Sequence, residues 1–160
     1  MATHQAIVEW ERGEQSFLDK RYQRVHRWSF DGGLTVAASS SPSIVPLPYS
    51  DAAAVDPEEA FVAALSSCHM LWFLDIASRR GYRVDSYRDA ALGHMMANAE
   101  GALWVGRVEL RPHVVFSGAV QPEEAMAQQL HRQAHAQCFL ANSVRSRIEI
   151  RATCTRVRGG

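Results

Sequence analysis

Apolar residues in the first part of the chain are spaced as they are in short strands. The run 6–10 is apolar and the segment 21–30 alternates between apolar and polar residues, so both predict β-strands. Asp31-Gly32-Gly33 is typical of a hairpin turn, and residues 34–38 should return as the next strand. The stretch 39–55 is rich in Ser and Pro, which predicts an extended connector rather than a domain boundary.

A long apolar helix is predicted after the connector. Asp56 suits the N-cap, Pro57 the first helical position and Gly81 a left-handed stop, so the helix should span about 57–80. The run 60–77 contains Ser, His and Asp, and a buried helix explains it better than a membrane span. Large apolar side chains occur on nearly every face: Phe61, Val62, Leu65, Met70, Leu71, Trp72, Phe73, Leu74 and Ile76. Such a helix has to be surrounded by protein, which favours a second subunit.

Two strand regions and a turn are predicted next. Residues 82–96 and 102–116 flank a polar turn at 97–101, which indicates an antiparallel hairpin. Within the second region Val108 and Leu110 alternate with Arg107, Glu109 and Arg111, so one face of the hairpin should be exposed to solvent.

The chain should end with a second helix and a last strand. The helix begins at Pro122-Glu123-Glu124, and apolar residues at a spacing of four continue it to about 135–138. Residues 147–157 form a strand that has Ile148, Ile150, Ala152 and Cys154 on one face. The order of strands, helix, strands, helix and strand predicts a single α+β domain with an antiparallel sheet.

Composition narrows the possible functions. The 160 residues suit one domain, and 17 basic residues balance 17 acidic ones. A neutral chain without a basic run gives no electrostatic reason to expect nucleic acid or an anionic membrane as partner. Residues 1–10 lack the pattern of a secretory signal, so we expect a reducing, cytoplasmic location. In that compartment reactive or metal-binding roles for the three cysteines gain weight over a structural disulfide.

The cysteines are the candidate chemistry. Cys68 lies in the middle of the first helix, Cys138 where the second helix ends, and Cys154 in the last strand. Taken singly, each is most simply a small buried hydrophobic residue. An alternative is a zinc site, because His131, His135 and Cys138 follow the spacing i, i+4, i+7 and share one helical face.

Two motifs surround the cysteines: DPEEAFVAALSSC at 56–68, and HAQC at 135–138 followed by Asn142-Ser143. Together they resemble the OsmC/Ohr family, named after osmotically inducible protein C and the organic hydroperoxide resistance protein. The first motif is similar to that family's helix with the peroxide-attacking cysteine, and the second is similar to the segment with the second cysteine. The interval of 70 residues from Cys68 to Cys138 and the Asp-Gly-Gly turn also fit. The resemblance covers about residues 20–152.

The resemblance implies a two-cysteine peroxidase built as an intertwined homodimer, with antiparallel sheets around long central helices. Cys68 would attack an organic hydroperoxide as a thiolate, and Cys138 would then form a disulfide with it. An external dithiol such as dihydrolipoamide would reduce the disulfide, and no cofactor is required. The family supports its thiolate with an arginine from the N-terminal strands and a glutamate at the start of the helix. Glu58 matches the glutamate and Arg24 best matches the arginine, although Arg21 and Arg27 are also candidates.

The remaining expectations concern specificity. Phe61, Leu65 and Trp72 surround Cys68 on the helix and would suit an apolar peroxide tail. Phe139 stands where many family members have proline, and His69 follows Cys68 as in one subgroup; His69 could tune the thiolate or merely pack. A non-catalytic protein that binds a small ligand in the same fold is the alternative function.

Overall fold

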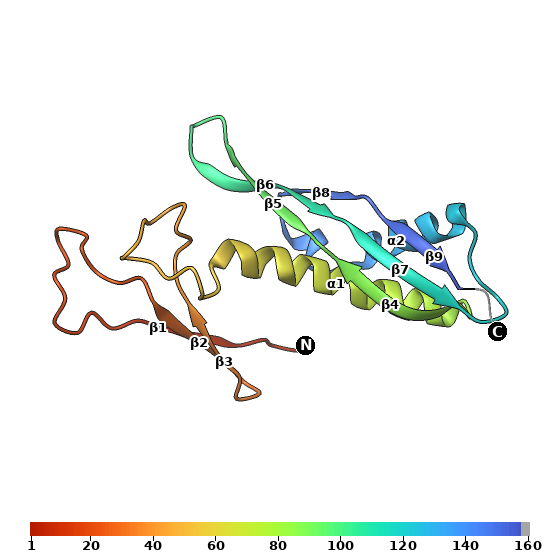
Figure 1. The fold of residues 1–160 in the computed structure, drawn as a ribbon, viewed down its shortest axis with the longest axis horizontal. Coiled ribbons are helices and arrows are strands. Elements are labelled where there is room, and N and C mark those ends of the chain that lie inside the picture. The colour runs from red at the N-terminus through yellow and green to blue at the C-terminus, as the bar shows by residue number, and fades with distance from the viewer. Residues whose placement is uncertain (158–160) are drawn as a thin grey trace. The chain divides into compact units, whose positions relative to one another are not determined.

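The structure is a computed structural model that describes residues 1–157. It divides into two compact units, Met1–Ala60 and Phe61–Gly160. The first unit contains β1 (Ala6–Glu9), β2 (His26–Phe30), β3 (Thr35–Ala38) and the start of α1 (Pro57–Arg79). The second contains the rest of α1, then β4 (Arg83–Asp89), β5 (Leu92–Ala97), β6 (Leu103–Leu110), β7 (Pro112–Ser117), α2 (Glu124–Gln137), the 3₁₀ turn η1 (Ala141–Ser143), β8 (Arg147–Ile150) and β9 (Thr153–Arg156) (Figure 1).

The N-terminal unit is built on the antiparallel sheet β1-β2-β3. The predicted turn joins β2 to β3, with Gly33 at a positive φ of 84°. The predicted strand 21–30 is too long, because only His26–Phe30 pairs in the sheet. Before it, Tyr22 stacks on Phe17 at 4.8 Å between ring centroids, and the Arg24 N–H donates to the Tyr49 carbonyl. These contacts replace the strand pairing.

Helix α1 has the ends predicted from the sequence. Asp56 Oδ1 accepts a hydrogen bond from the Glu59 N–H at 2.7 Å, and Glu59 Oε2 accepts one from the Asp56 N–H at 3.2 Å. This reciprocal pair is a capping box, and Gly81 ends the helix at a φ of 76°. By length and composition α1 could also cross a membrane, but Leu65, His69, Phe73 and Ala77 are buried within the C-terminal unit.

The predicted hairpin 82–116 forms with a correction. Its two regions pair antiparallel, but each is interrupted, so that β4 pairs with β7 and β5 with β6 in different three-stranded sheets. The interruption falls at Asp89 and Arg111: Asp89 Oδ1 accepts the Arg111 N–H at 2.7 Å, and the Arg111 guanidinium donates to the Ala90 carbonyl. Pro112 follows and has no N–H to continue β6.

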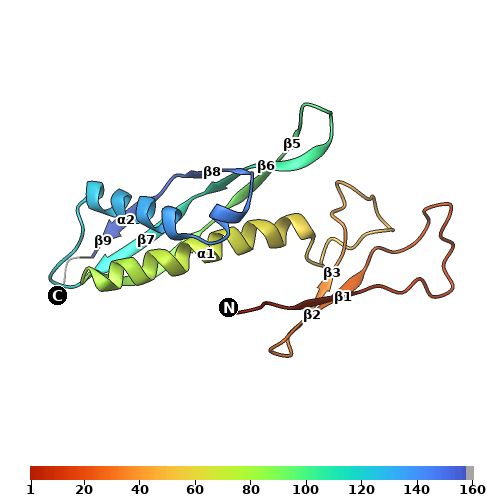
Figure 2. The same ribbon diagram turned by 180° about the vertical axis from the view of Figure 1, so that it is seen from behind.

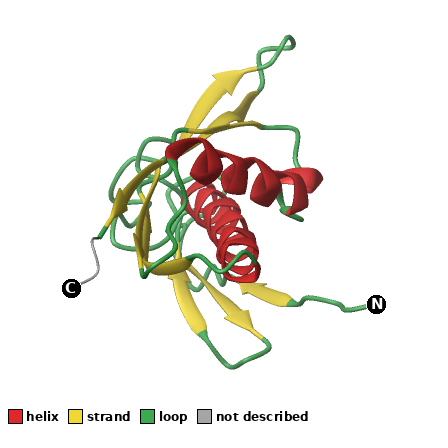
Figure 3. Ribbon diagram, turned by 90° about the vertical axis from the view of Figure 1, so that its right-hand side faces the viewer, coloured by secondary structure: helices red, strands yellow, loops and turns green. Residues whose placement is uncertain are grey.

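The predicted last strand is interrupted too. β8 joins β6 and β9 joins β7, and both pairings are parallel, so these two sheets are mixed and not antiparallel as predicted. The α+β class is correct. In Figures 1 and 2, helices α1 and α2 lie along one face of these strands, and Figure 3 shows the two helices side by side.

The core of the C-terminal unit lies between the helices and the strands. One cluster joins Phe73 of α1 and Leu130 of α2 to Val114 and Phe116 of β7. A second joins Leu65 of α1 to Val108 and Leu110 of β6. The alternation in β6 thus places its apolar residues as predicted.

Glu109 differs from the prediction of a solvent-exposed face. Its side chain is only 9% exposed, because Arg107, Arg111 and Arg151 form ion pairs with it at 3.3, 3.6 and 3.5 Å. Long arginine side chains cover the carboxylate, which a count of polar positions in one strand does not reveal.

Candidate active site

Helices α1 and α2 position the two cysteines. Cys68 lies in the middle of α1 and is partly exposed, whereas Cys138 is the C-cap of α2 and is 1% exposed. The Cys138 N–H donates to the His135 carbonyl at 3.3 Å, and its Sγ accepts a hydrogen bond from the Ala141 N–H at 3.4 Å. Asn142 Nδ2 donates to the Cys138 carbonyl at 2.9 Å. The turn after α2 therefore holds the second cysteine firmly.

The two thiols interact. Burial and hydrogen bonding with the Cys68 side chain raise the pKa of Cys138 to about 11, and the Ala141 N–H only partly opposes this rise. Cys138 is consequently protonated at neutral pH. The structure thus brings together the two cysteines that lie 70 residues apart, one buried and protonated and the other reachable from solvent.

Two buried histidines link the same helices. His69 follows Cys68 and is 1% exposed, and its Nε2 lies 3.0 Å from Nδ1 of His131, which is 3% exposed. Burial, above all, lowers the pKa of both imidazoles, so both are neutral at pH 7. This pair was not predicted from the sequence. The one available signal was that His131 shares a face of α2 with the buried Leu130 and Ala134.

The zinc alternative finds no support in this arrangement. His131 Nδ1 is hydrogen-bonded to His69 Nε2, and among residues 1–157 the buried His135 Nδ1 has no hydrogen-bond partner. Among residues 1–157, no group of three or more His, Cys, Asp or Glu side chains could hold a metal ion.

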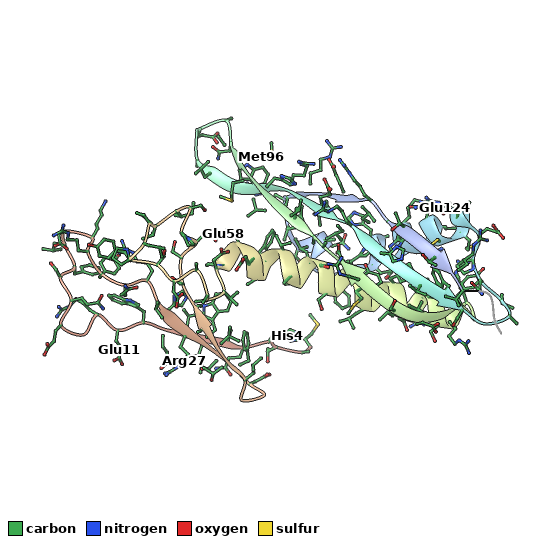
Figure 4. The ribbon with its side chains drawn as sticks, viewed as in Figure 1. His4, Glu11, Arg27, Glu58, Met96 and Glu124 are labelled. Atoms are coloured by element: carbon green, nitrogen blue, oxygen red, sulfur yellow. The ribbon has the colours of Figure 1, made fainter. Side chains whose placement is uncertain are left out.

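The predicted electrostatic residues belong to the N-terminal unit. The Arg24 guanidinium lies 3.7 Å from the centroid of the Tyr22 ring and donates to the Lys20 carbonyl at 2.8 Å. Glu58 is in the first turn of α1, where Figure 4 labels it, and its Oε2 is buried with no hydrogen-bond partner among the described residues. The structure therefore does not pair Arg24 with Glu58 within this unit.

The other two candidate arginines lie at the surface. Arg27, in β2, forms an ion pair with Glu9 at 2.8 Å, and Arg21 is exposed as well. Ten residues of continuous α1 separate Glu58 from Cys68, and ten residues span about 15 Å, so Glu58 cannot touch the thiol along the helix.

The predicted pocket residues have different environments. Leu65 is 1% exposed and packs with Val108 and Leu110, which leaves it no surface for a ligand. Phe61 is partly buried against the same cluster. Trp72 is partly buried as well, and its ring meets that of Phe139 edge-on at 5.4 Å between centroids. Phe61 and Trp72 are therefore the accessible members of the set.

Cys154 lies apart from this chemistry. It packs partly buried against the helix–sheet core, and its Sγ is 3.8 Å from Glu124 Oε2. Burial is the main cause that raises the pKa of the Cys154 thiol, and the Glu124 carboxylate adds to it. This environment is that of a core cysteine.

Comparisons with known proteins agree with the fold. The family model described as OsmC-like protein matches residues 50–153. An OsmC-like protein of unknown function from Vibrio cholerae has a structure similar to this chain, with a TM-score of 0.93 and 49% identity over 96% of this chain and 100% of that one. No curated protein matches. The chain belongs to the OsmC-like family.

More distant structures share the fold. An organic hydroperoxide resistance protein from Elizabethkingia anophelis has a TM-score of 0.68 and 18% identity, covering 98% of both chains. The organic hydroperoxide resistance protein OhrB of Bacillus subtilis has a TM-score of 0.59 and 16% identity, covering 96% of this chain and 98% of that one. Helix α1 is thus the core helix of an OsmC-like fold and not a membrane span.

Proposed function

We propose that this protein reduces organic hydroperoxides with Cys68 and Cys138. The observation that supports the proposal is the interaction of the two thiols, one partly exposed and one buried and protonated. The likeness in fold to organic hydroperoxide resistance proteins is consistent with it. The different environments of the two thiols support the proposed roles, in which Cys68 reacts with the peroxide and Cys138 then forms the disulfide with it.

The cycle has three balanced steps. The Cys68 thiolate attacks the terminal peroxide oxygen, the O–O bond breaks, and the leaving alkoxide takes a proton to become the alcohol. Cys68, now a sulfenic acid, is attacked by the Cys138 sulfur; the S–S bond forms, the S–O bond of Cys68 breaks, and the hydroxyl leaves as water with the Cys138 proton. An external dithiol then reduces the disulfide by exchange and is itself oxidised to a disulfide.

The raised pKa of Cys138 fits this order of events. Burial is its main cause, but hydrogen bonding and charge repulsion from Cys68 contribute. Both of these contributions decrease once Cys68 becomes an uncharged sulfenic acid. The resolving thiol therefore becomes more acidic at the step in which it must act as a nucleophile.

Arg24 and Glu58 are the proposed electrostatic support. A thiolate on an apolar helix needs a nearby cation, and Arg24 is our candidate, acting from the same or from a second subunit. The buried Glu58 oxygen, which has no partner within its own unit, is suited to accept a hydrogen bond from such an arginine.

A homodimer completes the proposal. The α1 side chain Leu71 is 60% exposed, and Leu92, Met95 and Met96 on β5 are each more than 40% exposed. Apolar surface on a core helix is typical of an interface, and a second copy of the chain would cover it. Reduction by a dithiol such as dihydrolipoamide requires a reducing compartment, which favours the cytoplasm.

The test is single-turnover hydroperoxide consumption by the wild type, Cys68→Ser and Cys138→Ser. We expect Cys68→Ser to consume none, and Cys138→Ser to consume one equivalent and to accumulate a dimedone-reactive sulfenic acid. Cys154→Ser is the matched control and should behave as the wild type. If the wild type consumes no alkyl or lipid hydroperoxide with dihydrolipoamide or thioredoxin supplied, the peroxidase proposal is wrong and the ligand-binding alternative takes its place.

A further inference from the structure

The hydrogen bond between His69 and His131 joins the two helices that carry the cysteines. His69 is the residue after Cys68 in α1. His131 precedes Cys138 by seven residues in α2, which is close to two full turns, so both point from one face of that helix. The Nε2–Nδ1 distance of 3.0 Å is that of a well-formed hydrogen bond between side chains 62 residues apart.

The packing around this bond is tight. The ring of Phe73, one turn after His69, stacks on His131 with 4.2 Å between centroids and 24° between planes. The two imidazoles are nearly parallel, at 3°. His131 is thereby held between Phe73 and His69, and one hydrogen bond sets how far the helices can slide past each other.

Two buried histidines are a costlier way to fill the core than apolar side chains are. Burial removes two imidazoles from water, and within the described part of the chain His69 Nδ1 has no hydrogen-bond partner. An aliphatic side chain would fill the space without this cost. A hydrogen bond, unlike an apolar contact, is directional and specifies one register of α1 against α2.

A second contact links the other cysteine. Phe139 follows Cys138, and its ring meets that of Trp72, one turn after Cys68, at 5.4 Å and 86°. The residue after each cysteine thus contacts the segment that contains the other cysteine. Phe139 and His69 are also the two positions that the sequence analysis singled out beside the cysteines.

We propose that His69 and His131 are positioning residues that hold Cys68 against Cys138. Their hydrogen bond fixes the two helices in the register in which the sulfur atoms can join. The inference rests on the proposed function only for its role in turnover, because the formation of the disulfide can be measured without any peroxide.

The experiment measures the equilibrium between the dithiol and the Cys68–Cys138 disulfide in buffers of reduced and oxidised dithiothreitol, with Cys154→Ser as the background. His69→Leu and His131→Leu remove the bond, and each should lower the equilibrium constant for the disulfide by about tenfold. His69→Gln and His131→Asn can place an amide near Nε2 and Nδ1 respectively, and each should recover most of the loss.

Ser117→Ala is the control for general destabilisation. It removes the hydrogen bonds that the buried Ser117 donates to Asp85 and accepts from Arg83 in the same unit, so it should weaken the fold without changing the disulfide equilibrium. Circular dichroism of each reduced variant confirms that it is folded, and the amide variants serve if a leucine variant is not. The inference is overturned if the folded histidine variants keep the wild-type equilibrium, if Ser117→Ala shifts it equally, or if the wild type never forms the disulfide.

The peroxidase proposal fails separately. If the wild type forms the disulfide with oxidised dithiothreitol but consumes no hydroperoxide, the proposed function is wrong. The positioning role would stand as long as the histidine variants still lowered the disulfide equilibrium.

Discussion

Asp89 accepts a hydrogen bond from Ser66 in α1, with 2.5 Å between Asp89 Oδ2 and Ser66 Oγ. Its other oxygen accepts the Arg111 N–H at 2.7 Å, at the interruption between β6 and β7. Ser66 lies two residues before Cys68. One carboxylate therefore holds α1 at the place where the two sheets diverge.

Replacement of Asp89 should destabilise the fold. Asp89→Ala removes two hydrogen bonds to a charged acceptor, and we expect the free energy of unfolding in urea to fall by roughly 2–3 kcal/mol. Asp89→Asn keeps one acceptor oxygen and should lose less. Asp31→Ala, in an exposed turn, is the control and should change little; an Asp89→Ala variant as stable as this control would contradict the assigned role.

The sequence predicted most of the elements but not how the sheets divide. Helix α1 has strong local signals at both ends, namely Asp56, Pro57 and Gly81, and it formed as predicted. The division at Asp89 and Arg111 depends on a hydrogen bond between residues 22 apart, which has no local pattern. The parallel entry of β8 and β9 likewise depends on tertiary pairing, since a strand pattern does not encode the direction of its neighbour.

Glu109 should contribute to the stability of the fold through its ion pairs with three arginines. Glu109→Ala leaves Arg107, Arg111 and Arg151 without their shared carboxylate. These arginines retain contact with water, so we expect a loss of about 1–2 kcal/mol in urea unfolding, less than for a fully buried ion pair. Glu9→Ala breaks an exposed pair with Arg27 and should have almost no effect. Equal losses for both variants would show that the burial of Glu109 does not matter.

The raised pKa of Cys138 predicts the order of alkylation. At pH 8 iodoacetamide should modify Cys68 well before Cys138, because the Cys138 thiol has a pKa of about 11 and is almost fully buried. Peptide mapping by mass spectrometry gives the two rates. In Cys68→Ala the pKa of Cys138 should fall but stay above its ordinary value, since burial persists. Faster labelling of Cys138 than of Cys68 in the wild type would reverse the roles proposed for them.

The buried histidine pair predicts a loss of stability in mild acid. Burial lowers the pKa of His69 and His131 below the ordinary value of about 6.5. As the pH falls, these histidines therefore bind protons in the unfolded chain before they do so in the folded chain. Stability is therefore complete above about pH 6.5 and decreases as the pH falls. Between pH 7.5 and 5.5 the two groups together should remove roughly 3 kcal/mol. Repulsion from His135 adds to the resistance of His69 to protonation.

Urea unfolding at several pH values checks this slope. His131→Asn removes one of the two imidazoles and should reduce the pH dependence by about half. The exposed His4 provides the control, and His4→Asn should leave the slope unchanged. If His131→Asn retained the full slope, the acid sensitivity would originate elsewhere in the molecule.

The candidate site was only partly predictable, because some of its contacts, like the division of the sheets, have no local sequence pattern. Cys68 and Cys138 could be paired because two motifs at a given distance resemble one family. Their histidine neighbours have no such motif, and a histidine between apolar residues is compatible with either a buried or an exposed place. Leu65 shows the opposite difficulty: helical spacing placed it near Cys68, but the same apolar character buries it against Val108 and Leu110.

Arg24 is the last residue whose role can be tested directly. If its guanidinium stabilises the Cys68 thiolate, Arg24→Gln should slow the first step of hydroperoxide reduction by about tenfold or more at pH 7. Single-turnover consumption of hydroperoxide, measured in a Cys138→Ser, Cys154→Ser background, gives the rate of that step. Arg24 also stacks on Tyr22, so Tyr22→Leu tests whether the stacking holds the guanidinium in place.

Arg21→Gln and Arg27→Gln are the matched controls for Arg24, because all three arginines precede the same turn. Arg27 forms an ion pair with Glu9, and the Arg21 side chain is exposed, so neither change should slow the first step of hydroperoxide reduction. If Arg21→Gln slowed this step and Arg24→Gln did not, the supporting cation would be Arg21. If none of the three variants slowed it, the thiolate would be stabilised without an arginine from this segment.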